Sequence, residues 1–93
     1  MGAVDFTHAS YGKTPEEAFK TAQEEARYDH GHAGYTGTIA EKDSFEIMTV
    51  PEDETINDFI DKTLDDNDKW GSAFCVKSRD VKDKYIFYGF ASF

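Results

Sequence analysis

The sequence predicts a single α+β domain, a two-layer sandwich in which two helices pack on a mainly antiparallel sheet of four to five strands. Two segments have the apolar spacing of amphipathic helices, and strand-like segments lie before, between and after them. The chain has 93 residues, 8 of them Phe, 5 Tyr and 1 Trp, which is enough for one core and one domain spanning residues 1–93. The expected element order is β-α-β(β)-α-β-β.

The first two elements are a strand at residues 3–10 and a helix at about residues 15–29. Apolar and polar residues alternate in the strand, which is typical of a half-buried strand. The helix begins after Thr14 with a capping box that has proline at the first helical position, and Gly31 is placed to end it. The apolar face of the helix consists of Phe19, Ala22 and Ala26.

A strand-like segment and a second helix are expected in the middle of the chain. Residues 36–50 are rich in β-branched and aromatic side chains, but residues 41–44 would suit a turn. Either two short strands or one bulged strand satisfies this pattern. The helix should open with Pro51 and the acidic run after it, and it should end before Gly71. Its apolar face consists of Ile56, Phe59, Ile60, Thr63 and Leu64.

The C-terminal part of the sequence predicts an antiparallel hairpin. Its strands are expected at residues 72–79 and 84–93, with the turn at residues 80–83. The last strand is apolar on both faces, which is typical of a central strand or of a strand covered by a partner on its second face. A homo-oligomer would accordingly be expected to form through this C-terminal strand, provided that its edge is exposed.

The charge balance indicates the kind of partner. The chain has 19 acidic and 10 basic residues, a formal net charge of −9 and a pI near 4.6. Direct binding to nucleic acid is disfavoured, because attraction to phosphates needs clustered Lys and Arg. A basic protein partner suits this charge, although a surface that merely keeps the protein in solution would have the same composition.

The cysteine usage and the hydropathy pattern predict a cytoplasmic protein. Cys75 is the only cysteine and lies in an alternating apolar run, so we expect a buried and inert thiol. No apolar run approaches the roughly 20 residues that a membrane span needs, so we expect no membrane association.

A series of acidic residues is the most informative charged pattern. Its members are spaced by 4, 3, 4 and 3 positions along the second helix, opposite the apolar face, and are Glu54, Asp58, Asp61, Asp65 and Asp68. If the helix continued through Asp68, one carboxylate would occur about every 5 Å of its axis, compared with one phosphate per roughly 3.4 Å of a DNA strand. Carboxylates disfavour a helix C-terminus, so a partner rich in Lys and Arg explains them better than helix stability does. We therefore predict a partner-binding surface, with a solubilising face as the alternative.

The loop after the first helix is the second candidate site. Residues 28–38 are rich in His, Gly and Tyr and would suit a small ligand, or a metal ion held by His30 and His32 with Asp29 or His8. Ordinary turns and histidines that cap the helix end explain the same composition. The candidate ligand-binding residues are Tyr28, His30, His32, Gly34, Tyr35 and Gly37.

Enzymatic activity and a cofactor are not expected. Ser10 and three histidines offer a nucleophile and a base, but no order or spacing singles out a catalytic triad. The loop at residues 28–38 matches no cofactor-binding signature. A ligand-binding or metal-binding loop with hydrolytic activity is the alternative to a binding protein.

Residues 28–42 have the sequence YDHGHAGYTGTIAEK, and residues 87–92 have the sequence FYGFAS. Together these segments, about a quarter of the chain, resemble parts of small uncharacterised proteins encoded by bacteriophages and bacteria. The resemblance brings no activity, cofactor or catalytic residue. For a phage protein it implies an inhibitor that blocks or redirects a host nucleic-acid-binding machine, since small acidic folds are a recurrent form of such inhibitors.

Overall fold

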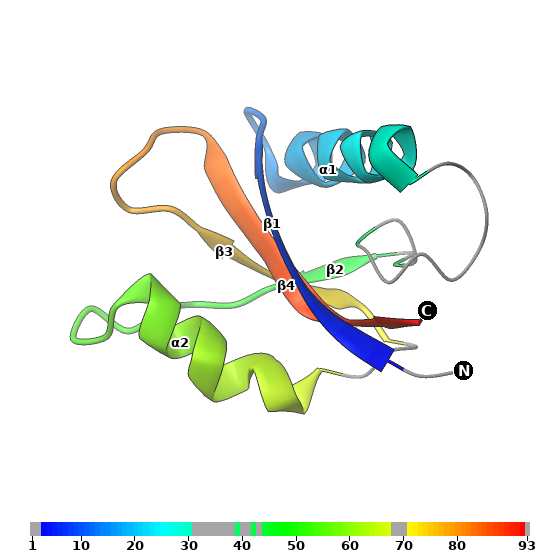
Figure 1. Ribbon diagram of the computed structural model, residues 1–93. Helices are drawn as coiled ribbons and strands as arrows, with labels where there is room; N and C mark the ends of the chain where they lie inside the picture. The colour runs from blue at the N-terminus through cyan, green and yellow to red at the C-terminus, as the bar shows by residue number, and fades with distance from the viewer. Residues whose placement is uncertain (1–2, 31–38, 40–41, 43, 68–70, 93) are drawn as a thin grey trace.

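The structure, a computed structural model, describes residues 3–30, 39, 42, 44–67 and 71–92. The elements in chain order are β1 (Ala3–Tyr11), α1 (Pro15–His30), β2 (Phe45–Ile47), α2 (Ile56–Thr63), a 3₁₀ turn η2 (Leu64–Asp66), β3 (Ala73–Lys77) and β4 (Lys84–Ser92). Figure 1 shows these elements gathered around one sheet. The α+β class and the expected order of helices and strands are confirmed.

The strands form one mixed sheet in the order β1-β4-β3-β2. β4 is antiparallel to both β1 and β3, whereas β2 is parallel to β3. The predicted hairpin and the central position of the last strand are therefore confirmed. β1 pairs with β4 along one edge, and β3 pairs with residues 85–88 along the other. The homo-oligomer through the C-terminal strand stays a prediction.

The two helices lie on opposite faces of the sheet, whereas we expected both on one face (Figure 1). Cys75 and Phe87 pack with α1 in one core cluster, and Val76 and Tyr88 pack with α2 in another. Successive side chains of a strand point to opposite faces, so β3 and β4 supply both clusters. This explains why the sequence of β4 is apolar on both faces.

The strand order explains this layering. β1, β2 and β3 run in the same direction, so the connections through α1 and α2 are both crossovers. The first crosses from one edge of the sheet to the other, and the second returns from β2 to its neighbour β3. Crossovers of the same hand that travel in opposite directions place their helices on opposite faces.

α1 forms where the capping box predicts it. The Oγ1 atom of Thr14 accepts a hydrogen bond from the Glu17 N–H at 3.2 Å. The Glu17 carboxylate accepts in turn from the Lys13 N–H at 3.0 Å. In a standard capping box it would accept from the N–H of the N-cap residue, which is Thr14 here. The predicted apolar face is confirmed, and the residues that it buries are Ala18, Phe19, Ala22 and Ala26. Gly31 lies outside the described residues.

β2 is shorter than the strand-like segment expected at residues 36–50. The ladder with β3 ends after the Met48 N–H donates to the Cys75 carbonyl at 2.8 Å. The next carbonyl groups, those of Val50 and Pro51, accept from the Arg79 guanidinium at 2.8 and 2.6 Å, so this part of the chain leaves the sheet. Residues 36–38, 40–41 and 43 lie outside the described residues, and the choice between two short strands and one bulged strand stays open.

α2 begins later and ends earlier than predicted. Thr55 is its N-cap, because the Thr55 Oγ1 accepts from the Asp58 N–H at 3.1 Å. The helix ends at Thr63, and Asn67, with φ −83° and ψ 141°, is extended. Asn67 leaves the helix because its side chain is hydrogen-bonded to β4, where the Phe90 N–H donates to Oδ1 at 2.9 Å. The predicted apolar face is confirmed, with Phe59, Ile60 and Thr63 buried and Ile56 and Leu64 partly buried.

Candidate functional site

α2 and the η2 turn that follows it carry a row of three aspartates, Asp58 and Asp61 on α2 and Asp65 on η2, which we call the α2 acidic row. All three are exposed. They are three and four positions apart and therefore share one side of the helical path, opposite the buried Phe59 and Ile60. The core contacts of α2 thus direct this row to the surface.

Two members of the predicted acidic series do not belong to the row. Glu54 precedes the helix cap, and its side chain is only 26% exposed. One of its carboxylate oxygens, Oε2, is buried without a hydrogen-bond partner among the described residues. Asp68 lies outside the described residues, and the extended Asn67 before it shows that α2 does not continue that far. The expectation of five carboxylates along one helix is therefore wrong.

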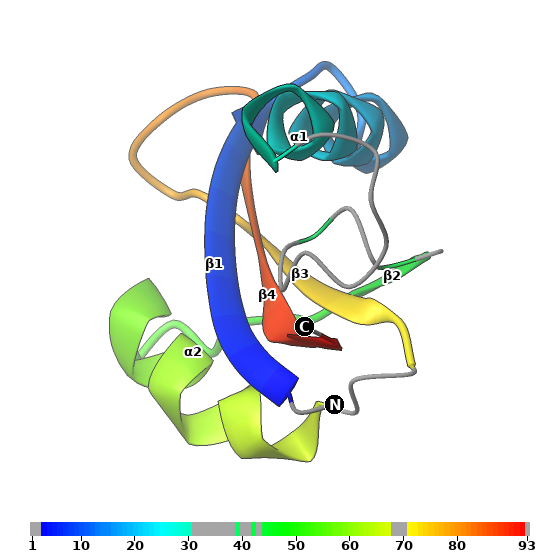
Figure 2. The same ribbon diagram turned by 45° about the vertical axis from the view of Figure 1, so that its right-hand side comes forward.

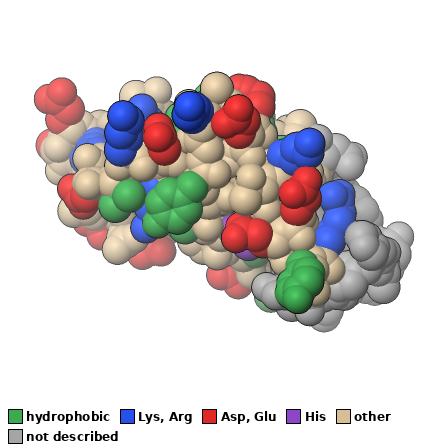
Figure 3. All heavy atoms as spheres, turned by 90° about the horizontal axis from the view of Figure 1, so that it is seen from above, with side chains coloured by type: hydrophobic (Ala, Val, Ile, Leu, Met, Phe, Trp, Pro, Cys, Tyr) green, Lys and Arg blue, Asp and Glu red, His purple; other side chains and the backbone are tan. Residues whose placement is uncertain are grey.

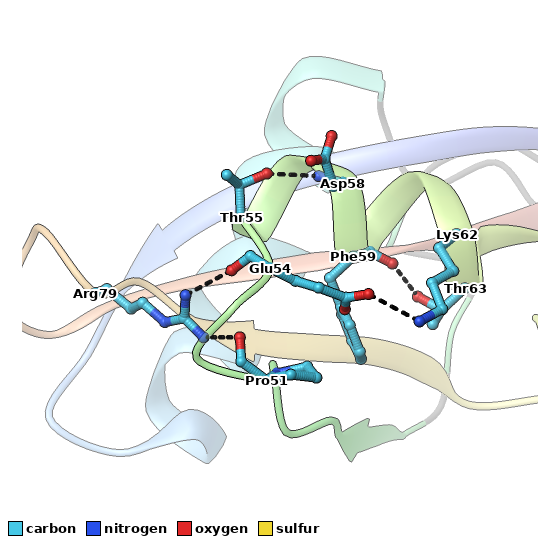
Figure 4. Close-up of polar contacts among 8 residues, drawn as sticks. All are labelled: Pro51, Glu54, Thr55, Asp58, Phe59, Lys62, Thr63 and Arg79. Atoms are coloured by element: carbon cyan, nitrogen blue, oxygen red, sulfur yellow. Dashed lines mark hydrogen bonds and ion pairs between the residues drawn. The ribbon is translucent and has the colours of Figure 1, made fainter.

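Lys62 is the cation closest in sequence to the acidic row, but it pairs with a different carboxylate. Its Nζ lies 2.8 Å from Glu54 Oε1, although Asp58 and Asp65 are within one helical turn (Figure 4). The hydrogen bond to Glu54 and the charge of Glu54 raise the pKa of the Lys62 ammonium. Among the described residues no cation lies within 4.0 Å of a carboxylate of the row. Within the described part of the chain, the three carboxylates of the row therefore have no ion-pair partner.

Arg79 holds the segment that leads into α2, as Figure 4 shows. Besides its bonds to Val50 and Pro51, its guanidinium donates to the Glu54 carbonyl at 2.7 Å. Three carbonyl groups of one loop are thus fixed to the end of β3. The sequence offers no signal for this contact, because Glu54 and Arg79 are 25 positions apart.

The buried side of α2 is fixed to β4 by a chain of hydroxyl groups. The Thr63 hydroxyl donates to the Phe59 carbonyl at 2.8 Å and lies 2.6 Å from the Tyr88 hydroxyl. Because the Thr63 proton is used for Phe59, the Tyr88 hydroxyl must donate to Thr63. Burial raises the pKa of Tyr88, which keeps this hydroxyl protonated as a donor. The acidic row therefore lies on a helix that is fixed at its start, by Arg79, and at its end, by Thr63.

The structure describes only part of the second candidate site. Tyr28 is 91% exposed, and His30 is the last residue of α1. His8 contacts Glu25 at 3.1 Å and so has a partner of its own. In the part of the chain that is described, no three His, Cys, Asp or Glu residues are grouped so as to hold a metal ion. The remaining candidates, His32, Gly34, Tyr35 and Gly37, lie outside the described residues.

Three comparisons with known proteins gave no match: none to protein-family models, none to curated proteins and none to solved structures. A function must therefore be argued from the residues of this chain. Within the described ranges, neither helix has the length and the apolar character needed to cross a bilayer.

A buried polar network that the sequence did not indicate lies where the end of η2 meets β4. Lys42 is only 2% exposed, and its Nζ donates to Asn67 Oδ1 at 3.1 Å and to the Gly71 carbonyl at 3.0 Å. The Gln23 side-chain amide of α1 donates to the Lys42 carbonyl. The Asn67 amide nitrogen donates to the Ser72 carbonyl at 2.8 Å. A lysine in a polar loop normally predicts an exposed side chain, so no local pattern could reveal this network.

Ser10, one of the hydroxyl groups considered as a nucleophile, and the single thiol are both buried. Ser10 is 1% exposed and has no hydrogen-bond partner among the described residues, so no base activates it. Cys75 is fully buried at 0% exposure, as predicted. Burial, together with the charge of Glu16, raises the pKa of Cys75 to about 12.

The burial of Cys75 predicts slow labelling and alkaline sensitivity. Native protein at pH 8 should react with a thiol reagent only at the rate at which it unfolds, whereas denaturant should make the reaction fast. Since the folded pKa is raised from 9.0 to about 12, the neutral thiol favours folding fully below pH 9 and progressively less as the pH rises towards 12. Denaturant titrations should show this fall, and it should be shallower in Cys75→Ala. Immediate labelling of the native protein would contradict the buried position.

Proposed function

We propose that the protein is a small acidic binding protein, without enzymatic activity, that engages a basic protein surface through the α2 acidic row. The observation that carries the proposal is the lack of a paired cation at Asp58, Asp61 and Asp65 among the described residues. A solubilising surface would tolerate neutralisation of these charges by Lys62, whose nearest carboxylate is instead Glu54. The net charge of −9 extends the same field over the molecule and favours fast association with a basic partner.

Nucleic-acid mimicry is the most specific form of this proposal. The three carboxylates are spaced by three and four residues, or about 5 Å on average at 1.5 Å per residue. Phosphates of one DNA strand are roughly 3.4 Å apart, so the partner's basic groups would meet a charge density of the same order. The resemblance to small phage proteins supports a host nucleic-acid-binding protein as the target. The row is short, which favours a target that reads a few phosphates rather than a long track.

Reversal of the row's charge tests the proposal. The triple variant Asp58/Asp61/Asp65→Lys should bind the partner at least about 100-fold more weakly, because three attractive contacts become repulsive. Affinity would be measured by biolayer interferometry against a partner captured from bacterial lysate, at several salt concentrations. The wild type should show a steep salt dependence, and the variant should lose it.

A matched control separates the row from the overall charge. Glu16, Glu46 and Asp80 are exposed and have no bonded cation among the described residues. Their replacement by lysine changes the net charge by the same amount as the reversal of the row. This control should bind within about threefold of the wild type. Equal losses in the two variants would show that only the net charge matters, and unchanged binding by the row variant would refute the proposal.

A further inference from the structure

Among the described strands, β1 is an edge strand nine residues long. β4 pairs with β1 on one side over its whole length, and no described element pairs with the other side (Figure 2). The Gly12 N–H donates to the Asp83 carbonyl at 3.0 Å. This bond shows which residues of β1 direct their backbone groups towards β4. Hydrogen-bonded pairs alternate along an antiparallel ladder. The residues whose N–H and C=O groups point away from β4 are therefore Asp5, Thr7, Ala9 and Tyr11.

This edge lacks the usual protection against strand pairing. Natural edge strands are short, or carry lysine, proline or a bulge. β1 contains neither lysine nor proline, and its register with β4 is unbroken from Ala3 to Tyr11. The opposite edge, β2, has only three residues and is protected by being short. Both ends of the exposed series carry side chains suited to contact, since Tyr11 is 58% exposed and Asp5 is also exposed.

The side of α1 nearest β1 carries a carboxylate. Glu25 marks this side, since its carboxylate lies 3.1 Å from the His8 imidazole on β1. Thr21 and Tyr28, four and three positions from Glu25, share this side and are exposed. Glu17 and Glu24 lie opposite the buried face, beside Lys20, which is three positions from Glu17 and four from Glu24. Figure 3, which looks onto α1, shows acidic and basic side chains both reaching this surface.

We propose that the outer edge of β1 binds an extended basic segment of a partner protein, which adds to the sheet as a further strand. The backbone groups of Asp5, Thr7, Ala9 and Tyr11 supply the hydrogen bonds. Alternate side chains of the added strand point to the two faces, where Glu25 lies on one side and Asp5 on the other. This surface differs from the α2 acidic row, and its role does not depend on that row.

The charges disfavour a second copy as the occupant. In an antiparallel pair of β1 strands, both α1 helices would lie on the same face of the joined sheet. Their β1 sides, each with Glu25, would then face each other across the junction. Each copy also carries a net charge of −9. Like charges brought together in this way oppose association.

The test uses a nine-residue peptide in which lysine alternates with valine, and an analogue with N-methyl groups on every second residue. Both peptides have the same charge, but the analogue cannot donate the ladder hydrogen bonds. The unmodified peptide should bind at least about tenfold more tightly. It should also slow hydrogen exchange at the amides of Asp5, Thr7, Ala9 and Tyr11, as measured by nuclear magnetic resonance.

A protein variant provides an independent arm. The Ala9 N–H points outward, so Ala9→Pro removes an outward donor without removing a bond to β4. This variant, once shown to be folded by circular dichroism, should lose the preference for the unmodified peptide. Equal binding of the two peptides by the wild type would overturn the proposal. Unchanged hydrogen exchange at the four amides after the unmodified peptide is added would also overturn it. Protection that depends on protein concentration without peptide would assign the edge to a second copy and would also overturn it.

Discussion

Replacement of Gly89 by alanine is expected to lower the free energy of unfolding by about 3 kcal/mol. Gly89 has φ +153°, a backbone conformation that residues with a Cβ rarely adopt. A Cβ at this position would also lie 2.3 Å from Asn67 Oδ1. Both the strain and the clash fall on the central strand. Equilibrium urea unfolding would measure the loss, and a change below about 0.5 kcal/mol would contradict the close approach of Asn67 to β4.

A second substitution separates the clash from the backbone strain. In the background of Asn67→Ala, the side chain that the new Cβ would meet is absent. The cost of Gly89→Ala should therefore be smaller in that background, and the two single losses should not add. Additive losses would show that backbone strain alone makes glycine necessary at this position.

The substitution Asn67→Ala is itself expected to cost about 3 kcal/mol, because one side chain satisfies three groups. Its Oδ1 accepts from the Phe90 N–H and from Lys42 Nζ, and its amide nitrogen donates to the Ser72 carbonyl. The Phe90 N–H points to the side of β4 that faces β3. Because β3 begins at Ala73, it has no residue opposite Phe90 that could accept this hydrogen bond. Removal of Asn67 would take away the acceptor of the Phe90 N–H and one of the acceptors of the buried Lys42 ammonium.

The conservative variant Asn67→Asp serves as the control. A carboxylate still accepts from Phe90 and Lys42, so this variant should lose clearly less stability than Asn67→Ala. It loses only the donor to Ser72. Urea unfolding of the two variants at neutral pH would make the comparison. Equal losses would show that the site depends on the shape of asparagine rather than on its acceptor oxygen.

The local patterns of the sequence predicted most of the fold. The apolar spacing of Phe19, Ala22 and Ala26 placed α1, and the apolar character of both faces of β4 indicated its central position. The layering depends on the direction of each crossover, which residue periodicity does not contain. The length of β2 also could not be predicted, because it is limited by the contacts of Arg79, some 28 positions away from Pro51.

The candidate site was predicted in part. Helical spacing correctly grouped Asp58, Asp61 and Asp65, since these residues share one exposed side of α2 and η2. Glu54 fitted the same spacing, but the cap at Thr55 starts the helix one residue later. Glu54 therefore reaches Lys62 from the loop before α2, and the spacing of residues along the helix does not predict this contact. The buried Lys42 shows the limit of such reasoning, because its environment is built from segments distant in the sequence.

The most direct test of the central proposal is affinity capture from bacterial lysate with competing double-stranded DNA. Wild-type protein, the Asp58/Asp61/Asp65→Lys variant and the Glu16/Glu46/Asp80→Lys control would be compared, with mass spectrometry of the retained proteins. We predict that the wild type and the control retain the same basic nucleic-acid-binding protein, that added DNA releases it, and that the row variant does not retain it. Retention of that protein by all three, unaffected by DNA, would contradict the proposal.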